Sequence, residues 1–305
     1  MTSRAVILVV GGTGRLGRHL IARLGSKDET VRVFTRIPNF TAACGDGRDV
    51  EVVVGDVRDP GAIERAVSGA RVVISAMSAF GATGGSLRHV DGEGNERLIG
   101  ACERHGVEQF ILVSVRGASA AHPMELHRMK YRAEQRLLRS TLAWSVLRPS
   151  SFTETFQQLI CAPLVHHGQA MIFGEGRNPI NFVSVCDVAR FLERAMSDDS
   201  MRGQALEIGG PENLTLTRFV EVFAAEAGVA ARAKHIPRIL MRLLSVAARP
   251  FNPAFARKAH AGLVMDTTDM RFDSTSLQAR FPTIHLTSAG EVARRDYGPS
   301  APQRA

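Results

Sequence analysis

The sequence contains few cysteines and none of the spacings that bind metals. Its four cysteines are scattered and form no CxxC pair; they are Cys44, Cys102, Cys161 and Cys186. A zinc site or a disulfide framework needs closely spaced or paired cysteines. In a reducing compartment, isolated cysteines of this kind are free thiols. The sequence therefore predicts neither a bound metal nor disulfides.

Long apolar runs and aromatic residues are also scarce. No apolar stretch has the length that a bilayer-spanning helix needs, and the first apolar run is too short for a secretory signal. Aromatic residues make up 6 %, without the aromatic–basic interleaving that reads single strands. The basic residues behind the formal charge of +8 are spread along the chain. We expect a soluble, cytoplasmic protein with a generally cationic surface and no nucleic-acid partner.

The chain does contain a regular alternation of strand-like and helix-like segments. Apolar, β-branched runs occur at 5–10, 30–36, 51–57, 70–78, 108–115 and 142–150, with helical spacing in the segments between them. This pattern predicts an α/β fold, a Rossmann-type doubly wound parallel sheet over residues 1–150. Residues 151–305 predict a mixed segment. Part of it returns to the Rossmann domain, and part forms a smaller C-terminal α/β lobe that holds substrate.

Three glycines follow the first strand at the spacing GxxGxxG. Gly11 permits a tight turn, Gly14 lets the backbone approach a pyrophosphate, and Gly17 lets the next helix pack closely on the sheet. The amide groups at the start of that helix then face the phosphates. We expect a dinucleotide here, with Thr13 and Leu16 of the same loop among its contacts.

The end of the second strand selects between NAD(H) and NADP(H). An NAD enzyme needs a carboxylate there for the ribose 2′-hydroxyl. This strand ends in Arg36, whose guanidinium suits a 2′-phosphate, and Arg15 in the glycine loop can assist it. Asp56, with Val57 beside it, is placed after the third strand to accept from the adenine amino group or to cap the following turn. The sequence favours NADP(H) over NAD(H).

These segments together resemble the short-chain dehydrogenase/reductase superfamily, and within it the atypical, NmrA-like NAD(P)-binding branch. The resemblance rests on GGTGRLGRHL, Arg36, GDVRDP, the Lys130 helix and LAWSVLRPSSF, and it spans residues 5–225. It implies that Ala76 and Met77, after the fourth strand, lie along the cofactor. It also implies that Phe152 lies near the nicotinamide.

The resemblance further implies a catalytic pair of Tyr and Lys, spaced Tyr-xxx-Lys. Lys130 matches the lysine, which would bind the nicotinamide ribose, but Leu126 stands at the tyrosine position. Tyr131 lies about 100° around the helix from Lys130 and faces elsewhere. His127, one turn before Lys130, or water is then the candidate proton donor. Ser114 or Ser119 would take the role of the family serine.

An amphipathic segment at 236–259 does not belong to the Rossmann pattern. Its apolar residues alternate with arginines, and Pro250 and Pro253 interrupt it. A lid over an apolar substrate, a dimer surface and a helix on an anionic membrane all fit this pattern. We favour packing against its own lobe, with the protein a monomer or a homodimer.

Two functions follow from these observations. The first is an NADPH-dependent oxidoreductase that transfers hydride to a small apolar carbonyl, enone or quinone. The second is an NADP(H)-sensing regulatory protein of NmrA type with little turnover, which the absence of the tyrosine favours. Lys130 and the second lobe favour the enzyme.

Overall fold

The computed structural model describes residues 5–25, 29–81 and 85–298, and the chain divides into two compact units. The first unit comprises residues 1–148 and 188–207, and the second comprises 149–187 and 208–305.

A seven-stranded sheet forms the centre of the first unit. Its strands are β1 (Ala5–Val10), β2 (Glu29–Thr35), β3 (Glu51–Val54), β4 (Ala70–Ser75), β5 (Gln109–Val113), β6 (Ala143–Pro149) and β10 (Gln204–Ile208). The strand order is β10-β6-β5-β4-β1-β2-β3, and the pairs from β3 to β6 are parallel. Read from β3, this is the 3-2-1-4-5-6 order of a Rossmann sheet. The predicted fold class is confirmed.

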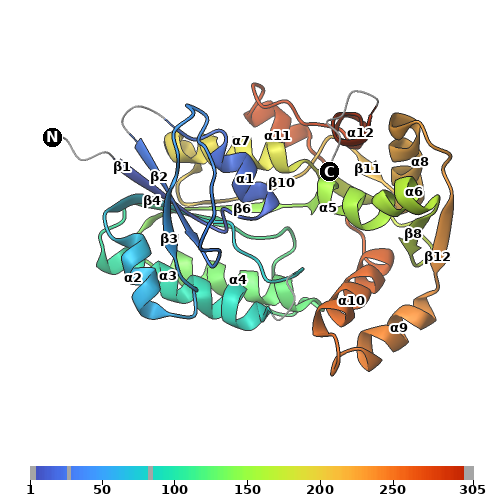
Figure 1. Ribbon diagram of the computed structural model, residues 1–305, viewed down its shortest axis with the longest axis horizontal. Coiled ribbons are helices and arrows are strands. Elements are labelled where there is room, and N and C mark those ends of the chain that lie inside the picture. Colours follow the sequence, from blue (N-terminus) through green and yellow to red (C-terminus); the bar gives the residue numbers. More distant parts are fainter. Residues whose placement is uncertain (1–4, 26–28, 82–84, 299–305) are drawn as a thin grey trace. The chain divides into compact units, whose positions relative to one another are not determined.

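Helices cover both faces of this sheet. They are α1 (Arg15–Ile21), α2 (Pro60–Val67), α3 (Glu93–Arg104), α4 (Glu125–Leu138) and α7 (Val185–Ser197), with a π-helical turn at Arg88–Gly92 and a 3-10 turn at Asp199–Met201. Figure 1 shows α2, α3 and α4 on one face of the sheet and α1 and α7 on the other. Because β1 is buried on both faces, all of Ile7–Val10 is apolar.

The core on the α2–α4 face explains which strand residues are apolar. Leu8, Val73 and Leu112 point from neighbouring strands into one cluster with Leu98 of α3 and Leu137 of α4. Strand side chains alternate between the two faces, so the intervening residues pack against the opposite helices. The sheet is therefore held from both sides, and its carboxyl edge carries the loops after β1, β2 and β4.

The second unit contains two small sheets and several helices. Its strands are β7 (Ser151–Phe152), β8 (Ala170–Phe173), β9 (Ile180–Val183), β11 (Asn213–Leu214) and β12 (Ala233–Ile236). Its helices are α5 (Thr153–Phe156), a π-helical turn at Gln157–Cys161, α6 (Ala162–His167), α8 (Leu216–Ala227), α9 (Arg238–Ala247), α10 (Pro253–Thr267), α11 (Thr275–Arg280) and α12 (Ala289–Tyr297). β7, β9 and β11 form one sheet, and β8 pairs with β12. Phe182, Phe219 and Phe223 lie at the centre of its core.

The predicted segment 236–259 proves to be two helices. Asn252 caps α10 by accepting from the Phe255 amide at 3.0 Å, and Pro253 occupies the first helical turn. Proline is well suited to that position because its missing N–H has no partner inside the helix. Pro253 therefore starts a helix and does not break one.

Candidate cofactor site

The glycine loop lies where β1 and β4 end side by side. Gly11 has a φ of +92°, and a Cβ there would lie 2.7 Å from the carbonyl carbon of Ala76. A Cβ on Gly17 would lie 2.3 Å from the Gly11 carbonyl oxygen. Both positions require glycine, because the loop, α1 and the end of β4 approach one another so closely. The topology changes direction between β1 and β4, where Rossmann folds bind their ligands.

The first turn of α1 is open to an anion. Gly14 is the N-cap and supplies no side chain to the helix amides, and no acidic residue lies in the first turn. Gly14 is exposed and Leu16 is buried, so the loop presents backbone to solvent and anchors itself through the leucine. The first amides of a helix have no partners inside it. This cradle fits a pyrophosphate, with the half-buried Arg15 beside it. Thr13, on the same loop, accepts from Arg18 through its carbonyl at 3.1 Å.

Basic groups surround the place expected for the adenosine ribose. Arg36 is exposed directly after β2 and lies close enough to Asp56 to help lower its pKa. The main cause of that lower pKa is Arg58, which donates to both Asp56 oxygens at 2.9 and 2.8 Å. Asp56 also accepts from the Arg58 amide, so it caps the turn as the sequence allowed. Two guanidinium groups therefore lie near one carboxylate, which leaves a net positive charge that suits a 2′-phosphate.

Ala76 and Met77, which follow β4, lie beside other residues that were predicted to bind the cofactor. The Ala76 amide donates to the Val10 carbonyl at 2.8 Å, which aligns the chain beyond β4 with the glycine loop. The carbonyl of Met77 accepts from the Lys130 ammonium at 2.8 Å. Val57 packs on the core beside these loops. The structure therefore places Lys130 and Met77 in direct contact.

Lys130 is buried in a polar network that the sequence analysis missed. Its ammonium lies 3.2 Å from an Asp91 oxygen, an ion pair more than a well-directed hydrogen bond. The other Asp91 oxygen accepts from the Ala79 amide at 2.9 Å. Asn95 donates to the Asp91 carbonyl and accepts from the Ser75 hydroxyl, both at 2.7 Å.

The spacing of Asp91 and Asn95 was the available signal for this network. They lie four residues apart, on one helical face, and both are fully buried. Helical spacing between the strands at 70–78 and 108–115 predicts a helix there, but it does not mark the π-helical turn that carries Asp91. An ammonium has three protons, and these two contacts engage two of them. Among the described residues, the Lys130 ammonium therefore keeps at least one proton without an acceptor.

Ser114 directly follows β5, and its hydroxyl is buried. Its amide donates to the Leu147 carbonyl at 2.8 Å, but its Oγ has no hydrogen-bond partner among the described residues. Buried hydroxyls are normally satisfied, so an unpartnered one marks a place for water or a ligand. This environment agrees with the serine role that the resemblance implies.

His127 is an unfavourable proton donor in this environment. Its ring stacks on His122 with centroids 3.7 Å apart. Burial, with a smaller contribution from His122, lowers the pKa of His127 from 6.5 to about 3. The imidazole is therefore neutral near neutral pH, and a neutral imidazole is a weak acid.

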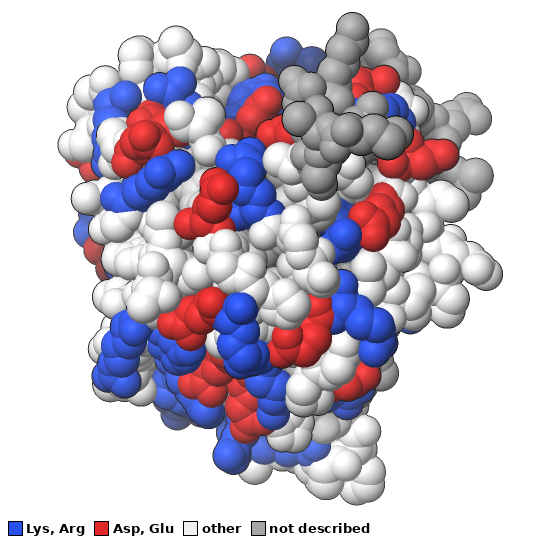
Figure 2. All heavy atoms as spheres, turned by 90° about the vertical axis from the view of Figure 1, so that its left-hand side faces the viewer, with Lys and Arg blue, Asp and Glu red and all other residues white. Residues whose placement is uncertain are grey.

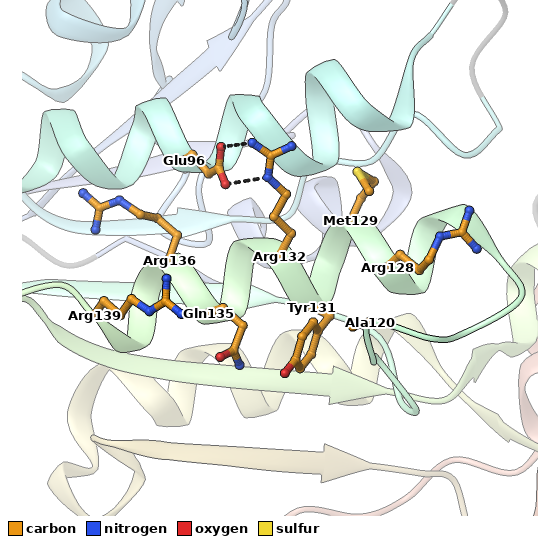
Figure 3. A pocket seen from close by; sticks show the side chains of 9 residues that line it. All are labelled: Glu96, Ala120, Arg128, Met129, Tyr131, Arg132, Gln135, Arg136 and Arg139. Carbon is orange, nitrogen blue, oxygen red and sulfur yellow. Dashed lines mark hydrogen bonds and ion pairs between the residues drawn. The ribbon is translucent and has the colours of Figure 1, made fainter.

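Tyr131 is separated from Lys130 by its position on α4. It lines a surface pocket with Arg128 and Gln135, whereas Lys130 is buried. Figure 3 shows Tyr131 and Gln135 on the opposite side of α4 from Arg132, which pairs with Glu96. The tyrosine therefore does not replace the family acid. Phe152 lies in β7 of the second unit and is half-buried, and its contact with the nicotinamide stays a prediction.

Residues 11–199 match the sequence profile of a protein family described as NAD(P)H-binding. The chain belongs to this NAD(P)H-binding family. The match begins at Gly11 and includes Arg36 and Lys130. It confirms the expected nicotinamide dinucleotide, which the resemblance to NmrA-like, atypical short-chain dehydrogenases/reductases implies.

The proteins that this chain resembles include both an assembly factor and reductases. The chain is 26 % identical over 238 residues to the photosystem II assembly factor Ycf39 of Synechocystis sp., covering 78 % of this chain and 72 % of that protein. The NADPH-dependent quinone oxidoreductase QOR2 of Escherichia coli, complexed with NADPH, aligns with a TM-score of 0.72 and 18 % identity over 94 % of this chain and 98 % of that one. The Citrobacter sp. triphenylmethane reductase complexed with NADP(H) aligns with a TM-score of 0.74 and 17 % identity over 95 % and 99 %. At these identities the structural likeness shows the fold.

Proposed function

We propose that this protein is an NADPH-dependent oxidoreductase that reduces a small apolar carbonyl, enone or quinone. The observation that carries the proposal is the buried ammonium of Lys130, fixed by Asp91 and the Met77 carbonyl with one proton to spare. A lysine held in this way at the carboxyl edge can orient the ribose of a nicotinamide. The cofactor supplies a hydride, and the substrate takes up that hydride and one proton.

The residues at this edge favour acceptors that need no strong acid. The tyrosine position holds Leu126, and His127 is neutral with a pKa of about 3. Ser114 and water remain to deliver a proton. A quinone accepts hydride readily because the resulting oxygen anion is stabilised by its ring, and the anion then takes a proton from water. Among the three substrate classes we favour quinones, and the name of QOR2 supports this choice.

Arg36 supports NADPH as the cofactor in use. It stands exposed at the end of β2, where NAD enzymes carry a carboxylate, and Arg58 neutralises the nearby Asp56. Both structural relatives described above were solved with phosphorylated cofactors, as their names state.

A cofactor-sensing protein is the second candidate. The leucine at the tyrosine position favours it, as does the similarity to Ycf39, whose name describes an assembly factor. In that function the protein would bind NADP(H) and change partners without rapid hydride transfer.

The deciding experiment measures NADPH binding and NADPH oxidation separately. Purified protein is titrated with NADPH by fluorescence, and oxidation is then followed with a panel of quinones, enones and aldehydes. We expect turnover with at least one quinone, greatly reduced in Lys130→Met. Arg139→Ala, an exposed arginine near the end of the same helix, is the matched control. Tight binding without turnover on the whole panel would leave the sensor as the function.

A further inference from the structure

The excess positive charge of the chain is concentrated in one segment. Residues 227–265 contain seven of the 38 Lys and Arg and none of the 30 Asp and Glu. They therefore account for all but one unit of the formal charge of +8. Basic residues occur along the whole chain, but their excess over acidic residues is confined almost entirely to this segment. On the face drawn in Figure 2, by contrast, basic and acidic side chains are intermingled.

The same segment exposes an apolar stripe, although the other side of α9 packs on its own unit. Ile239, Leu243 and Val246 lie at helical spacing on one side of α9 and are 75 %, 62 % and 63 % exposed. The side of α9 that packs inward carries Met241 and Ser245. The expected packing of α9 on its own lobe is made through this narrower side, along which α10 lies, and the broader apolar stripe faces solvent.

Aromatic residues extend this stripe around the turn between α9 and α10. Phe251 is 90 % exposed and lies in the turn after α9, where its amide donates to the Ala248 carbonyl. Phe255, in the first turn of α10, is 44 % exposed. Figure 1 shows this turn pointing away from β8 and β12 of the same unit. The tip of the α9–α10 pair is thus formed by large apolar side chains.

We propose that the α9–α10 tip docks on the surface of an anionic phospholipid bilayer. Apolar side chains at the tip would enter the headgroup region, and the exposed Arg242 and Arg249 of the same helix pair would face the lipid phosphates. Arg242, exposed beside the stripe, is placed to do so. No helix in the described part of the chain has both the length and the apolarity to cross a bilayer. The contact is therefore interfacial.

The charge also argues against a second copy of this chain as the occupant. In a two-fold interface the same patch meets itself, so two acid-free segments would bring like charges together. An intramolecular lid over an apolar substrate would use the apolar stripe of α9 but would give no role to the arginines beside it. An anionic surface uses both features.

The test is flotation of the full-length protein with lipid vesicles. One set contains phosphatidylcholine alone, and the other contains phosphatidylcholine mixed with phosphatidylglycerol. We expect binding to the anionic vesicles that falls as salt is raised, because added salt screens surface charges. Leu243→Ser and Phe251→Ser should each weaken it about tenfold or more, since each removes a large apolar group. Arg242→Glu should weaken it by about fivefold or more.

Matched changes on the first unit serve as controls. Leu138→Ser and Arg139→Glu alter an exposed leucine and an exposed arginine near the end of α4, and we expect vesicle binding to be unchanged. All variants should bind NADPH as the wild type does, which shows that they are folded and separates this test from the proposed function.

Three results would overturn the proposal. The first is no flotation with anionic vesicles by protein that binds NADPH. The second is loss of a dimer in light scattering on Leu243→Ser without any vesicle binding, which would identify a second copy as the occupant. The third is a higher KM for a quinone in Leu243→Ser without vesicle binding, which would identify a lid.

Discussion

Helices α4 and α9 are both amphipathic and rich in arginine, yet they turn opposite faces to solvent. In α4 the apolar residues Ala133 and Leu137 are fully buried, and Arg132 on the outer side pairs with Glu96. In α9 the widest apolar stripe is outside, with no acidic residue on the helix or near it in the sequence. The helical period shows that a helix has an apolar side. Which side meets the core depends on the layer that is available to cover it.

The buried charges of α4 give the largest expected effect. Lys130→Ala leaves the Asp91 carboxylate buried without its cation, which we expect to cost about 3–5 kcal/mol of folding free energy. Asp91→Asn combined with Lys130→Met removes both charges and should restore most of that stability, measured by urea denaturation. NADPH oxidation should stay low in the double variant. Recovered oxidation there would mean that Lys130 acts only as a structural partner.

A pair of leucines tests the comparison directly. Leu137→Ala empties a fully buried position of α4 and should cost about 2–5 kcal/mol. Leu243→Ala on α9, where the side chain is already exposed, should change stability by no more than about 0.5 kcal/mol. Both losses are measured from the midpoints of urea denaturation, provided that the dependence of the unfolding free energy on urea concentration is unchanged. Equal losses would show that the α9 stripe is covered in solution.

Exposed arginines should also differ between the two regions. Arg36→Ala removes a charge-assisted contact to a 2′-phosphate, so NADPH affinity should fall about 10- to 100-fold while NADH affinity is unchanged. Arg242→Ala, on α9, should leave both affinities as they are. Isothermal titration with the two cofactors measures the difference. An equal loss for NADH would assign Arg36 to a site common to both cofactors.

The pH dependence of stability should report His127 at the start of α4. Its folded pKa of about 3 lies below the usual 6.5, so the unfolded chain binds the extra proton between these values. The stabilisation that neutral His127 gives to the folded state is complete above pH 6.5. It is lost as the pH falls, at about 1.4 kcal/mol of unfolding free energy per pH unit. His127→Phe should flatten this slope between pH 6.5 and about 5, before the carboxylates protonate. An unchanged slope would place the protonation elsewhere, with His122, whose pKa burial also lowers, the first to examine.

Much of the cofactor site was predictable because its determinants are local. Gly11, Gly14 and Gly17 follow a buried strand and open a helix, and that order alone places a phosphate cradle. Arg36 was assigned to the 2′-phosphate by counting along the chain to the end of the second strand; the structure shows it exposed there, and its contact with the phosphate stays a prediction. The contact between Lys130 and Asp91 was not predictable in this way, because it joins two helices 39 residues apart through a π-helical turn.

The sequence by itself determined the doubly wound sheet, the glycine loop and the cationic, amphipathic character of residues 236–259, because strand and helix periods and turn residues are short-range properties. The tertiary structure alone decided that Lys130 is paired with a buried carboxylate, that His127 is buried and therefore neutral, and that the stripe of α9 faces outward. Each of these depends on which surfaces meet, and burial sets both the cost of a charge and the fate of an apolar side chain.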